Sequence, residues 1–384
     1  MLKKLRIQNF KSWEDTGEME MAPITMFFGG NSSGKSSILQ FLLMLKQTRN
    51  SYDKAQILNF GGKENDIIDL GNFRDVIFNH ELDRVLGFRI DEDFAGQHFL
   101  SAKIKQKNDE LFSEVIYQDL PFEYEHQPFK MELPLATCLT GLSSLGSIEY
   151  LGPLRQSPQR EYQWKNTSPS TVGKKGEYAV DAILAEKKES ILEKKIAAAL
   201  QKMGLVESFR VAQIPTTDLY QILIKKTKNS AEVLLPDVGF GVSQILPVLT
   251  SLFYSPVGSI IILEQPEIHL HPKAQAELAD VVVEAVKERK IQVIIESHSE
   301  HFLTRIQTRI ADGALSKDAA KLYFCRNEID ESKPKEIGKS ELEELKIDDS
   351  GRIENWPKDF FGDMLGETSN RVRAYLDRKK TSKK

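Results

Sequence analysis

The stretch "GGNSSGKSS" (Gly29–Ser37) decides the fold class of this chain. The apolar residues of "MAPITMFFGG" predict a buried strand before it, and the apolar spacing of "KSSILQFLLMLKQTRN" (Lys35–Asn50) predicts a helix directly after it. Glycines let the backbone N–H groups of such a turn point inward, and the helix N-terminus adds positive potential. The pattern therefore predicts a phosphate-binding loop (P-loop), and the alternative is a strand–helix turn that binds nothing.

Residue types within the loop indicate how it would bind a nucleotide. The Lys35 ammonium group can reach the β- and γ-phosphates of a triphosphate, and the Ser36 hydroxyl can ligate Mg²⁺. ATP and Mg²⁺ are the cofactors that this arrangement predicts. The residues expected to contact the nucleotide are Gly29, Gly30, Asn31, Ser32, Ser33, Gly34, Lys35, Ser36 and Ser37.

A second apolar strand, in "SIIILEQPEIHLHP" (Ser259–Pro272), ends in polar residues. Glu264 lies at its carboxyl end, where α/β sheets bind ligands, and its carboxylate can hold the water shell of Mg²⁺. The alternative is an acid that ends a strand at the surface. Gln265 follows, where many ATPases carry the acid that activates water. An amide orients water but cannot take its proton, so we expect slow hydrolysis of ATP.

Two other acids are candidates for activating water in place of Gln265. Glu267 lies two residues further on, and Glu296 ends the next predicted strand, Ile291–Ser297. Structural roles are the alternatives, with Glu267 capping the turn and Glu296 pairing with an arginine. His298 follows the same strand and can hydrogen-bond a γ-phosphate or position water, although a structural histidine is the competing interpretation.

The segment "DVGFGVSQILPVL" (Asp237–Leu249) predicts a second helix start suited to phosphate. Gly239 and Gly241 allow close approach of the backbone, and Ser243 and Gln244 offer polar groups as the apolar helix begins. A loop followed by an ordinary helix cap is the alternative.

The remaining pattern divides the chain into an α/β core and two further regions. Strand–helix–strand units with fully apolar strands predict a parallel sheet that is buried on both faces. Alternating segments from about Arg84 to about Leu133 predict an antiparallel β lobe, and Gly176–Leu205 is expected to be helical. The expected division is 1–50 and 231–384 for the two halves of the core, 51–150 for the β lobe, and 151–230 for a linker and helical region.

Composition narrows the functional classes. The 384 residues carry a net charge of −4, so contact with DNA would need a local basic patch, for which Lys3, Lys4, Arg6 and Lys11 are candidates. Two cysteines are too few for a disulfide framework or a zinc cluster. No apolar run reaches the roughly 20 residues of a membrane span, and we expect a cytoplasmic protein without a membrane partner.

The whole set of motifs resembles the ABC-type ATPases of the recombination and chromosome-maintenance branch. More narrowly, the chain resembles the AAA-type ATPase part of overcoming-lysogenization-defect (OLD) proteins. The resemblance implies an α/β P-loop NTPase fold of ABC type, with a mixed or parallel sheet, an inserted antiparallel β lobe and a helical region. It is carried by "LKKLRIQNFKSWED", "GGNSSGKSS", "YLGPLRQSPQREYQW", "VGFGVSQILP", "LEQPEIHLHP", "ESHSEHFLTRI" and "IENWPKDFFGD".

Several residue roles follow from the resemblance alone. It implies a head-to-tail homodimer, or a higher homo-oligomer, in which Ser243 and its glycines touch the γ-phosphate bound by the opposite subunit. His298 matches the switch histidine and Glu264 the Walker B acid. Gln265 matches the position usually held by the catalytic Glu.

The resemblance also implies a type of function. Arg155 and Arg160 are expected to contact phosphate or to signal the ATP state, with surface ion pairs as an equal alternative. No second acidic cluster follows His301, so nuclease activity in this chain is not expected. The implied function is a nucleotide-driven switch for a separate nuclease or toxin-like effector in DNA maintenance, DNA repair or phage defence. The alternative is a module that holds ATP without hydrolysing it.

Overall fold

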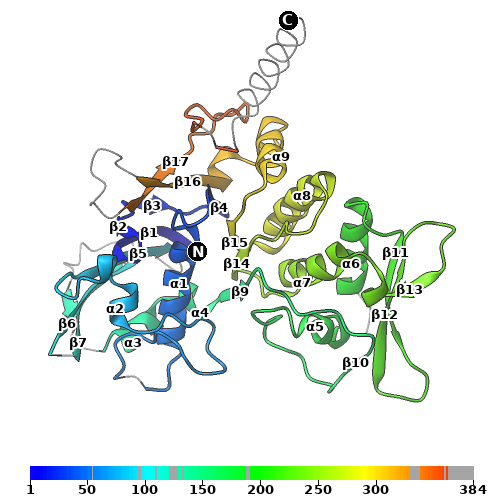
Figure 1. Ribbon diagram of the computed structural model, residues 1–384, viewed down its shortest axis with the longest axis horizontal. Helices are drawn as coiled ribbons and strands as arrows, with labels where there is room; N and C mark the ends of the chain where they lie inside the picture. Colours follow the sequence, from blue (N-terminus) through cyan, green and yellow to red (C-terminus); the bar gives the residue numbers. More distant parts are fainter. Residues whose placement is uncertain are drawn as a thin grey trace, which may run out of the picture.

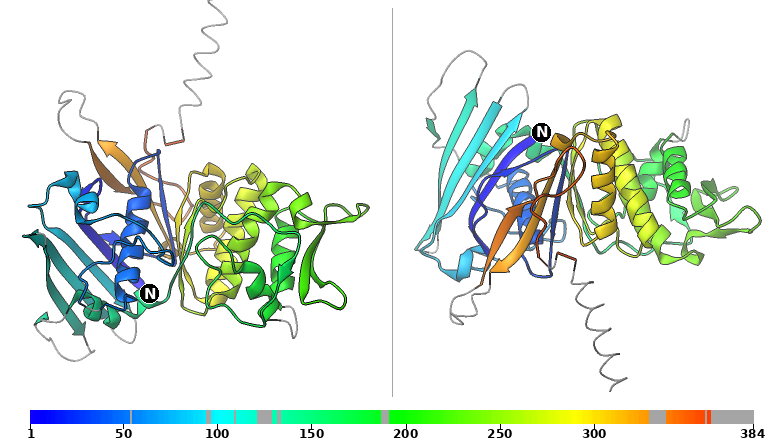
Figure 2. Two further views of the ribbon diagram at one scale, coloured as in Figure 1. Left: turned by 60° about the horizontal axis from the view of Figure 1, so that its bottom comes forward. Right: turned by 90° about the horizontal axis from the view of Figure 1, so that it is seen from above.

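The protein is described by a computed structural model that covers residues 1–53, 55–93, 97–108, 110–120, 129–131, 134–186, 191–328, 338–358 and 360–361. Within these residues a β lobe and a helical region lie on opposite sides of a central sheet (Figures 1 and 2). The described structure therefore has three parts: the β lobe, the central sheet and the helical region. The central sheet lies between the other two.

The central sheet is the part that positions the site. Its strand order is β17–β16–β4–β15–β14–β9, and all neighbours are parallel except β16 and β17. The strands are β4 (Ile24–Gly29), β9 (Ile148–Leu151), β14 (Ile260–Glu264), β15 (Gln292–Glu296), β16 (Ala320–Glu328) and β17 (Lys339–Glu344). Every residue of β14 and β15 is buried, as expected for parallel strands covered on both faces.

Helices cover both faces of this sheet. α1 (Lys35–Arg49) packs between the central sheet and the β lobe, whereas α7, α8 and α9 cover the other face (Figure 1). The bounds of these three are α7 (Phe240–Tyr254), α8 (Pro272–Arg289) and α9 (Glu300–Ala311). The expected helix after the P-loop is confirmed, because apolar side chains of α1 face both sheets.

The β lobe is antiparallel, as expected, and has the order β2–β1–β5–β6–β7–β8 with β3 paired to β1. Its strands are β1 (Leu2–Phe10), β2 (Trp13–Asp15), β3 (Met19–Glu20), β5 (Leu86–Asp93), β6 (Gln97–Lys107), β7 (Glu110–Leu120) and β8 (Phe129–Met131). Short helices fill the connections: α2 (Phe73–Val76), α3 (Leu135–Cys138), α4 (Ser143–Gly146), and the 3₁₀ turns η1 (Phe78–His80) and η2 (Leu139–Gly141).

The helical region packs on α7 and carries a small antiparallel sheet of its own. Its helices are α5 (Ala179–Ala185) and α6 (Ile191–Lys202), so two helices stand where the sequence predicted helix throughout Gly176–Leu205. Its strands are β10 (Tyr162–Gln163), β11 (Ser208–Gln213), β12 (Leu219–Lys225) and β13 (Glu232–Leu234), followed by η3 (Leu235–Asp237). The last 3₁₀ turn, η4 (Lys317–Ala319), precedes β16.

Two strands pair in sheets that differ from the division drawn from the sequence. β1 lies in the β lobe, since it pairs antiparallel with β5, although the sequence grouped residues 1–50 with the core. β9 lies in the core sheet and not in the lobe, since it pairs in parallel with β14. Chain order alone could not show either exchange.

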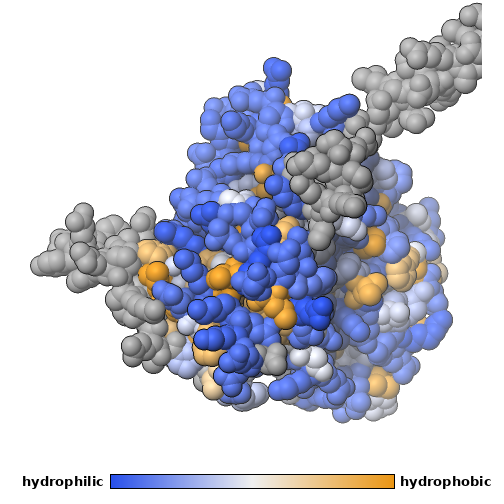
Figure 3. Space-filling model, turned by 60° about the vertical axis from the view of Figure 1, so that its left-hand side comes forward, coloured by the Kyte–Doolittle hydropathy of each residue, from blue (hydrophilic) through white to orange (hydrophobic). Residues whose placement is uncertain are grey.

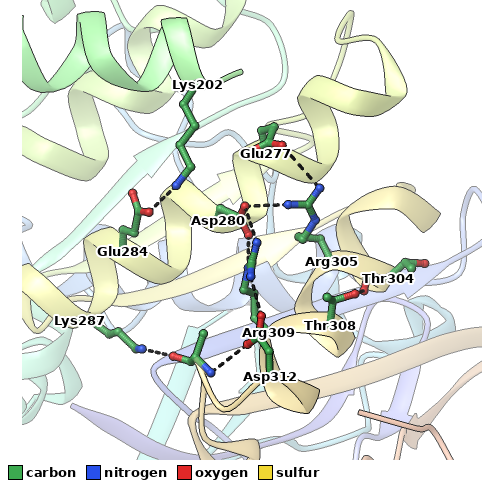
Figure 4. Close-up of polar contacts among 11 residues, drawn as sticks. Lys202, Glu277, Asp280, Glu284, Lys287, Thr304, Arg305, Thr308, Arg309 and Asp312 are labelled. Carbon is green, nitrogen blue, oxygen red and sulfur yellow. Dashed lines mark hydrogen bonds and ion pairs between the residues drawn. The ribbon is translucent and has the colours of Figure 1, made fainter. Parts of the chain in front are cut away.

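An ion-pair network clamps α8 to α9 (Figure 4). Asp280 of α8 is 4% exposed and accepts from the Arg305 Nη1 at 2.8 Å and the Arg309 Nε at 2.6 Å. Lys202 of α6 pairs with Glu284, one turn further along α8, in a more exposed position. Because α9 starts two residues after His298, this clamp also holds the segment that follows β15.

Asp280→Asn is therefore expected to lower the free energy of unfolding by about 2 kcal/mol. The amide leaves two half-buried guanidinium groups without their shared charge. Urea unfolding followed by circular dichroism measures the change. Glu284→Gln is the matched control, because it breaks an exposed pair on the same helix and should cost less than about 0.5 kcal/mol. Equal costs for the two variants would contradict the role given to Asp280.

The outer face of the β lobe is mostly hydrophilic, with hydrophobic side chains in small separate groups (Figure 3). Each basic residue considered for DNA contact has a partner: the pairs are Lys3–Asp93, Lys4–Glu18, Arg6–Asp15 and Lys11–Gln40. Three of the four charges are thus balanced by an acid. None of the helices in the described residues has the length and hydropathy needed to cross a bilayer.

Candidate nucleotide-binding site

The candidate site lies at the carboxyl edge of the central sheet. β15 runs between β4 and β14, with Glu296 opposite Phe27 on one side and opposite Glu264 on the other. The P-loop leaves the end of β4 at the same edge. Parallel strands thus bring together the loop, the strand-end acid and the end of β15 that leads to His298, as expected for a ligand site in an α/β sheet.

Two glycines of the loop are required by close packing. Gly29 has φ of 139°, and a Cβ there would overlap the carbonyl oxygen of Cys325 on β16. Gly34 has φ of 91°, and a Cβ there would meet the Trp13 indole, whose Nε1 donates to the Gly34 carbonyl at 3.0 Å. The loop is therefore held from the β lobe, a contact that the sequence did not suggest.

Lys35 occupies the mouth of the loop. Its Nζ donates to the carbonyl oxygens of Gly29 at 3.1 Å and Gly30 at 2.7 Å, and the residue is 3% exposed. Burial lowers the pKa of Lys35, and the carboxylate of Glu296 acts in the opposite direction. Asn31 and Ser32 at the tip of the loop are exposed, whereas Ser33 is buried behind it.

Two buried carboxylates lie at the ends of β14 and β15. The Ser36 Oγ donates to Glu296 Oε2 at 2.7 Å, and the Tyr150 hydroxyl donates to Glu264 Oε1 at 3.0 Å. Burial, and then the charge of Glu296, raises the pKa of Glu264 to about 7. Burial also raises the pKa of Glu296. The hydroxyl of Ser36 and these two carboxylates offer oxygen ligands, which Mg²⁺ prefers.

Residues that follow β14 and β15 connect the ends of these two strands by hydrogen bonds. Gln265 takes φ of 45° directly after β14, and its backbone N–H donates to the Glu296 carbonyl at 2.8 Å. Glu267 is 6% exposed, and its Oε1 accepts from the Ser297 hydroxyl at 2.7 Å and the His298 N–H at 2.9 Å. Glu267 thus orders the loop that carries His298.

The two arginines singled out from the sequence have different environments. Arg155 is 8% exposed, and its Nη2 donates to the carbonyl oxygens of Glu264 at 3.1 Å and Gln265 at 3.2 Å. Burial lowers its pKa to about 10. Arg160 forms an exposed pair with Asp237 at 2.7 Å. Arg155 therefore contacts the edge directly, and Arg160 has the surface ion pair given as its alternative.

The start of α7 presents backbone instead of the expected side chains. Ser243 is 5% exposed and its Oγ donates to the Phe240 carbonyl at 2.7 Å, while Gln244 is 3% exposed. The accessible residues are Gly239, which is the N-cap, and Phe240, with Gly241 partly buried against the 267–270 turn. Ser243 and Gln244 lie on the inward side of the first helical turn, a rotation set by packing.

His298 provides a test of proximity to phosphate. The residue is exposed, yet partial burial of the imidazole and then the charge of Lys35 hold the pKa of His298 below its ordinary value. A bound nucleotide adds negative charge, which favours the protonated form and should raise this pKa. An NMR titration of the imidazole with and without ADP measures the change. A pKa that stays unchanged or falls would place His298 away from the phosphates.

Three parts of the chain match known protein families, and the whole chain has a known fold. Residues 1–135 match the family model "AAA ATPase domain", residues 165–304 match "AAA domain, putative AbiEii toxin, Type IV TA system", and residues 315–370 match a protein family of unknown function, DUF3696. In fold, the chain is similar to a crystal structure of an SMC head bound to the C-terminal winged-helix domain of ScpA. That likeness has a TM-score of 0.53 at 13% identity and covers 90% of this chain and 98% of the other.

The fold is that of an ABC-type P-loop ATPase. An SMC head from Pyrococcus furiosus gives the same result, with a TM-score of 0.52 at 12% identity and coverage of 90% of this chain and 96% of the other. Among curated proteins, the OLD nuclease of Thermus scotoductus is 23% identical over 340 residues, which is 79% of this chain. The match spans 60% of the length of that relative. The resemblance of this chain to OLD proteins is confirmed.

Proposed function

We propose that this OLD-like chain binds ATP with Mg²⁺, hydrolyses it slowly and uses the bound state to control a separate effector. The observation that carries the proposal is the convergence of Lys35, Ser36 and Glu264 at one sheet edge, with the Ser36 hydroxyl already fixed by Glu296. These groups have the chemistry that a triphosphate and its cation require.

Binding would exchange the internal partners of the loop for phosphate. Lys35 leaves the carbonyl oxygens of Gly29 and Gly30 for the β- and γ-phosphates, where its charge has a stronger partner. Ser36 and Glu264 would hold Mg²⁺, which supplies charge neutralisation at the phosphate oxygens. The backbone N–H groups at the start of α1 complete the cradle.

Slow hydrolysis follows from the residues around the expected water. Gln265 orients water but cannot deprotonate it. Glu267 has one carboxylate oxygen committed to Ser297 and His298 and is almost fully buried, which favours its structural alternative. A general base typically contributes about 10²–10⁴-fold to the rate, and this contribution is weakened here. Positioning of the attacking water and stabilisation of the phosphate charge are retained.

Effector control is supported by the links between the phosphate edge and the rest of the molecule. Glu267 joins the 267–270 turn to the His298 loop, and that turn packs against the start of α7. A change at the phosphates can therefore move the exposed start of α7, where a second copy of the chain would dock. The ScpA-bound SMC head shows that a protein of similar fold carries a separate partner domain. The relation to OLD proteins favours a nuclease or toxin-like effector in DNA maintenance or phage defence.

A time course of phosphate release tests the switch. We expect several turnovers per chain at a low rate, and a mass measurement by light scattering should rise from monomer to dimer when Mg²⁺ and ATP are added. No release of phosphate, with the bound ATP recovered intact, would favour the second candidate, a module that holds ATP without hydrolysing it. The buried, hydrogen-bonded state of Glu267 is the observation that keeps this candidate in consideration.

A further inference from the structure

We propose that Glu296 acts on the cation side of the nucleotide site, where it fixes the Ser36 hydroxyl for Mg²⁺, and that it is not the base that activates water. The inference rests on the proposed function, because it concerns the same P-loop edge. With this role for Glu296, the acidic groups near the cation come from two neighbouring strands, Glu264 from β14 and Glu296 from β15.

Strand order brings Glu296 closer to the P-loop than Glu264. β15 is the direct neighbour of β4, whereas β14 is the next strand along. Neighbouring strands lie about 4.8 Å apart, so Glu296 is one strand spacing from the P-loop strand and Glu264 is two. The observed bond agrees, since the Ser36 hydroxyl donates to Glu296 and not to the strand-end acid Glu264.

The direction of that hydrogen bond prepares the hydroxyl for a cation. A serine hydroxyl has one hydrogen and two lone pairs, and a carboxylate only accepts. At 2.7 Å the hydrogen is committed to Glu296 Oε2, so the Ser36 lone pairs are left for an electron-pair acceptor. Groups that orient a metal ligand in this way typically contribute about 10–100-fold to metal affinity.

Both carboxylates are oriented by different donors. Tyr150 holds one oxygen of Glu264 and Ser36 holds one oxygen of Glu296. The two residues are 9% and 4% exposed, and Lys35 is the nearby ammonium group. Arg155 and Glu267 at the same edge offset each other. The charges of Glu264 and Glu296 exceed that of Lys35, and a divalent cation would reverse this excess and suit the phosphates.

A water-activating role fits Glu296 poorly. A general base needs a free oxygen within hydrogen-bond reach of the attacking water. The oxygen of Glu296 that faces α1 already accepts from Ser36, and the side chain is almost fully buried. Glu296 contacts Ser36, which is expected to ligate Mg²⁺, and this contact favours a role beside the cation.

Glu296→Gln should change nucleotide affinity in opposite directions with and without metal. With Mg²⁺, ADP affinity should fall by about 10–100-fold, because the new amide can donate to the Ser36 oxygen and occupy the lone pair that the cation needs. With EDTA, ADP affinity should stay equal or increase, because the variant removes a negative charge near the phosphates. If Glu296 only supported the fold, its replacement would lower ADP affinity both with Mg²⁺ and with EDTA.

Calorimetric titration with ADP, in Mg²⁺ and in EDTA, measures this on the full chain. Glu300→Gln is the matched control, since it removes one exposed carboxylate four residues further on and should leave both affinities unchanged. Binding of Mn²⁺ followed by electron paramagnetic resonance gives a second readout that does not depend on turnover. Wild type and control should retain the ion with ADP, and Glu296→Gln should release most of it.

The outcomes separate the two proposals. A wild type that binds no ADP in either condition refutes the proposed function, and this inference with it. If the wild type binds ADP, and if Mg²⁺ increases the ADP affinity of Glu296→Gln as much as that of the wild type, only the role given to Glu296 is refuted. Weaker binding of the variant in both conditions also refutes that role. Loss of the Mg²⁺ gain with intact binding in EDTA supports it.

Discussion

Lys35→Met is expected to lower the affinity for ATP by at least about 100-fold, because two charge-assisted contacts with phosphate are lost. The methionine keeps the apolar stem and removes only the ammonium group. That group bridges the carbonyl oxygens of Gly29 and Gly30, so it lies at the mouth of the loop. Equilibrium binding of a fluorescent ATP analogue measures the loss.

Lys11→Met is the matched control for this experiment. Lys11 also lies close to α1, where it donates to Gln40, but it is not part of the loop. Its replacement should change ATP affinity less than about twofold. Thermal melting of both variants confirms that each is folded. Wild-type affinity in a folded Lys35→Met protein would show that the loop does not bind phosphate.

Gln265→Glu is expected to raise the turnover number for ATP by about 10²-fold or more. The residue directly follows Glu264 at the carboxyl end of β14, and its side chain is partly exposed at the edge where phosphate is expected. A carboxylate there can take the proton of the attacking water. Its neighbours Glu264 and Glu296 should raise the pKa of the new acid, so the gain in rate should grow as pH increases.

The rate of phosphate release at saturating ATP, measured across neutral and mildly alkaline pH, tests this second prediction. Gln265→Ala serves as the comparison, since it removes both the proton acceptor and the orienting amide and should be slower than wild type. If Gln265→Glu binds ATP normally and hydrolyses it at the wild-type rate, residue 265 is not on the water side.

Local patterns carried most of the information about the core. The P-loop pattern, the apolar strands and the helix after Lys35 each depend on neighbouring residues, and the structure places α1 at Lys35–Arg49, one residue short of the predicted end. Strand ends that meet at one edge of a parallel sheet follow from the βαβ pattern. Glu264 and Glu296 could thus be placed together before their contacts were known.

Contacts between distant segments could not be predicted in the same way. Tyr150 and Glu264 are 114 positions apart, and Trp13 reaches Gly34 from the β lobe. Ser243 is buried because tertiary packing sets the rotation of α7, which the local sequence does not encode. The assignment of β1 to the lobe depends on its pairing with β5, an element that begins more than seventy residues later.

Calorimetry of the wild-type chain with ATP and Mg²⁺ tests the central claim most directly. The convergence of Lys35, Ser36, Glu264 and Glu296 predicts a saturable heat with one nucleotide per chain, and weaker binding when EDTA replaces Mg²⁺. A folded sample that shows no heat of binding at millimolar ATP, with Mg²⁺ present, would contradict it.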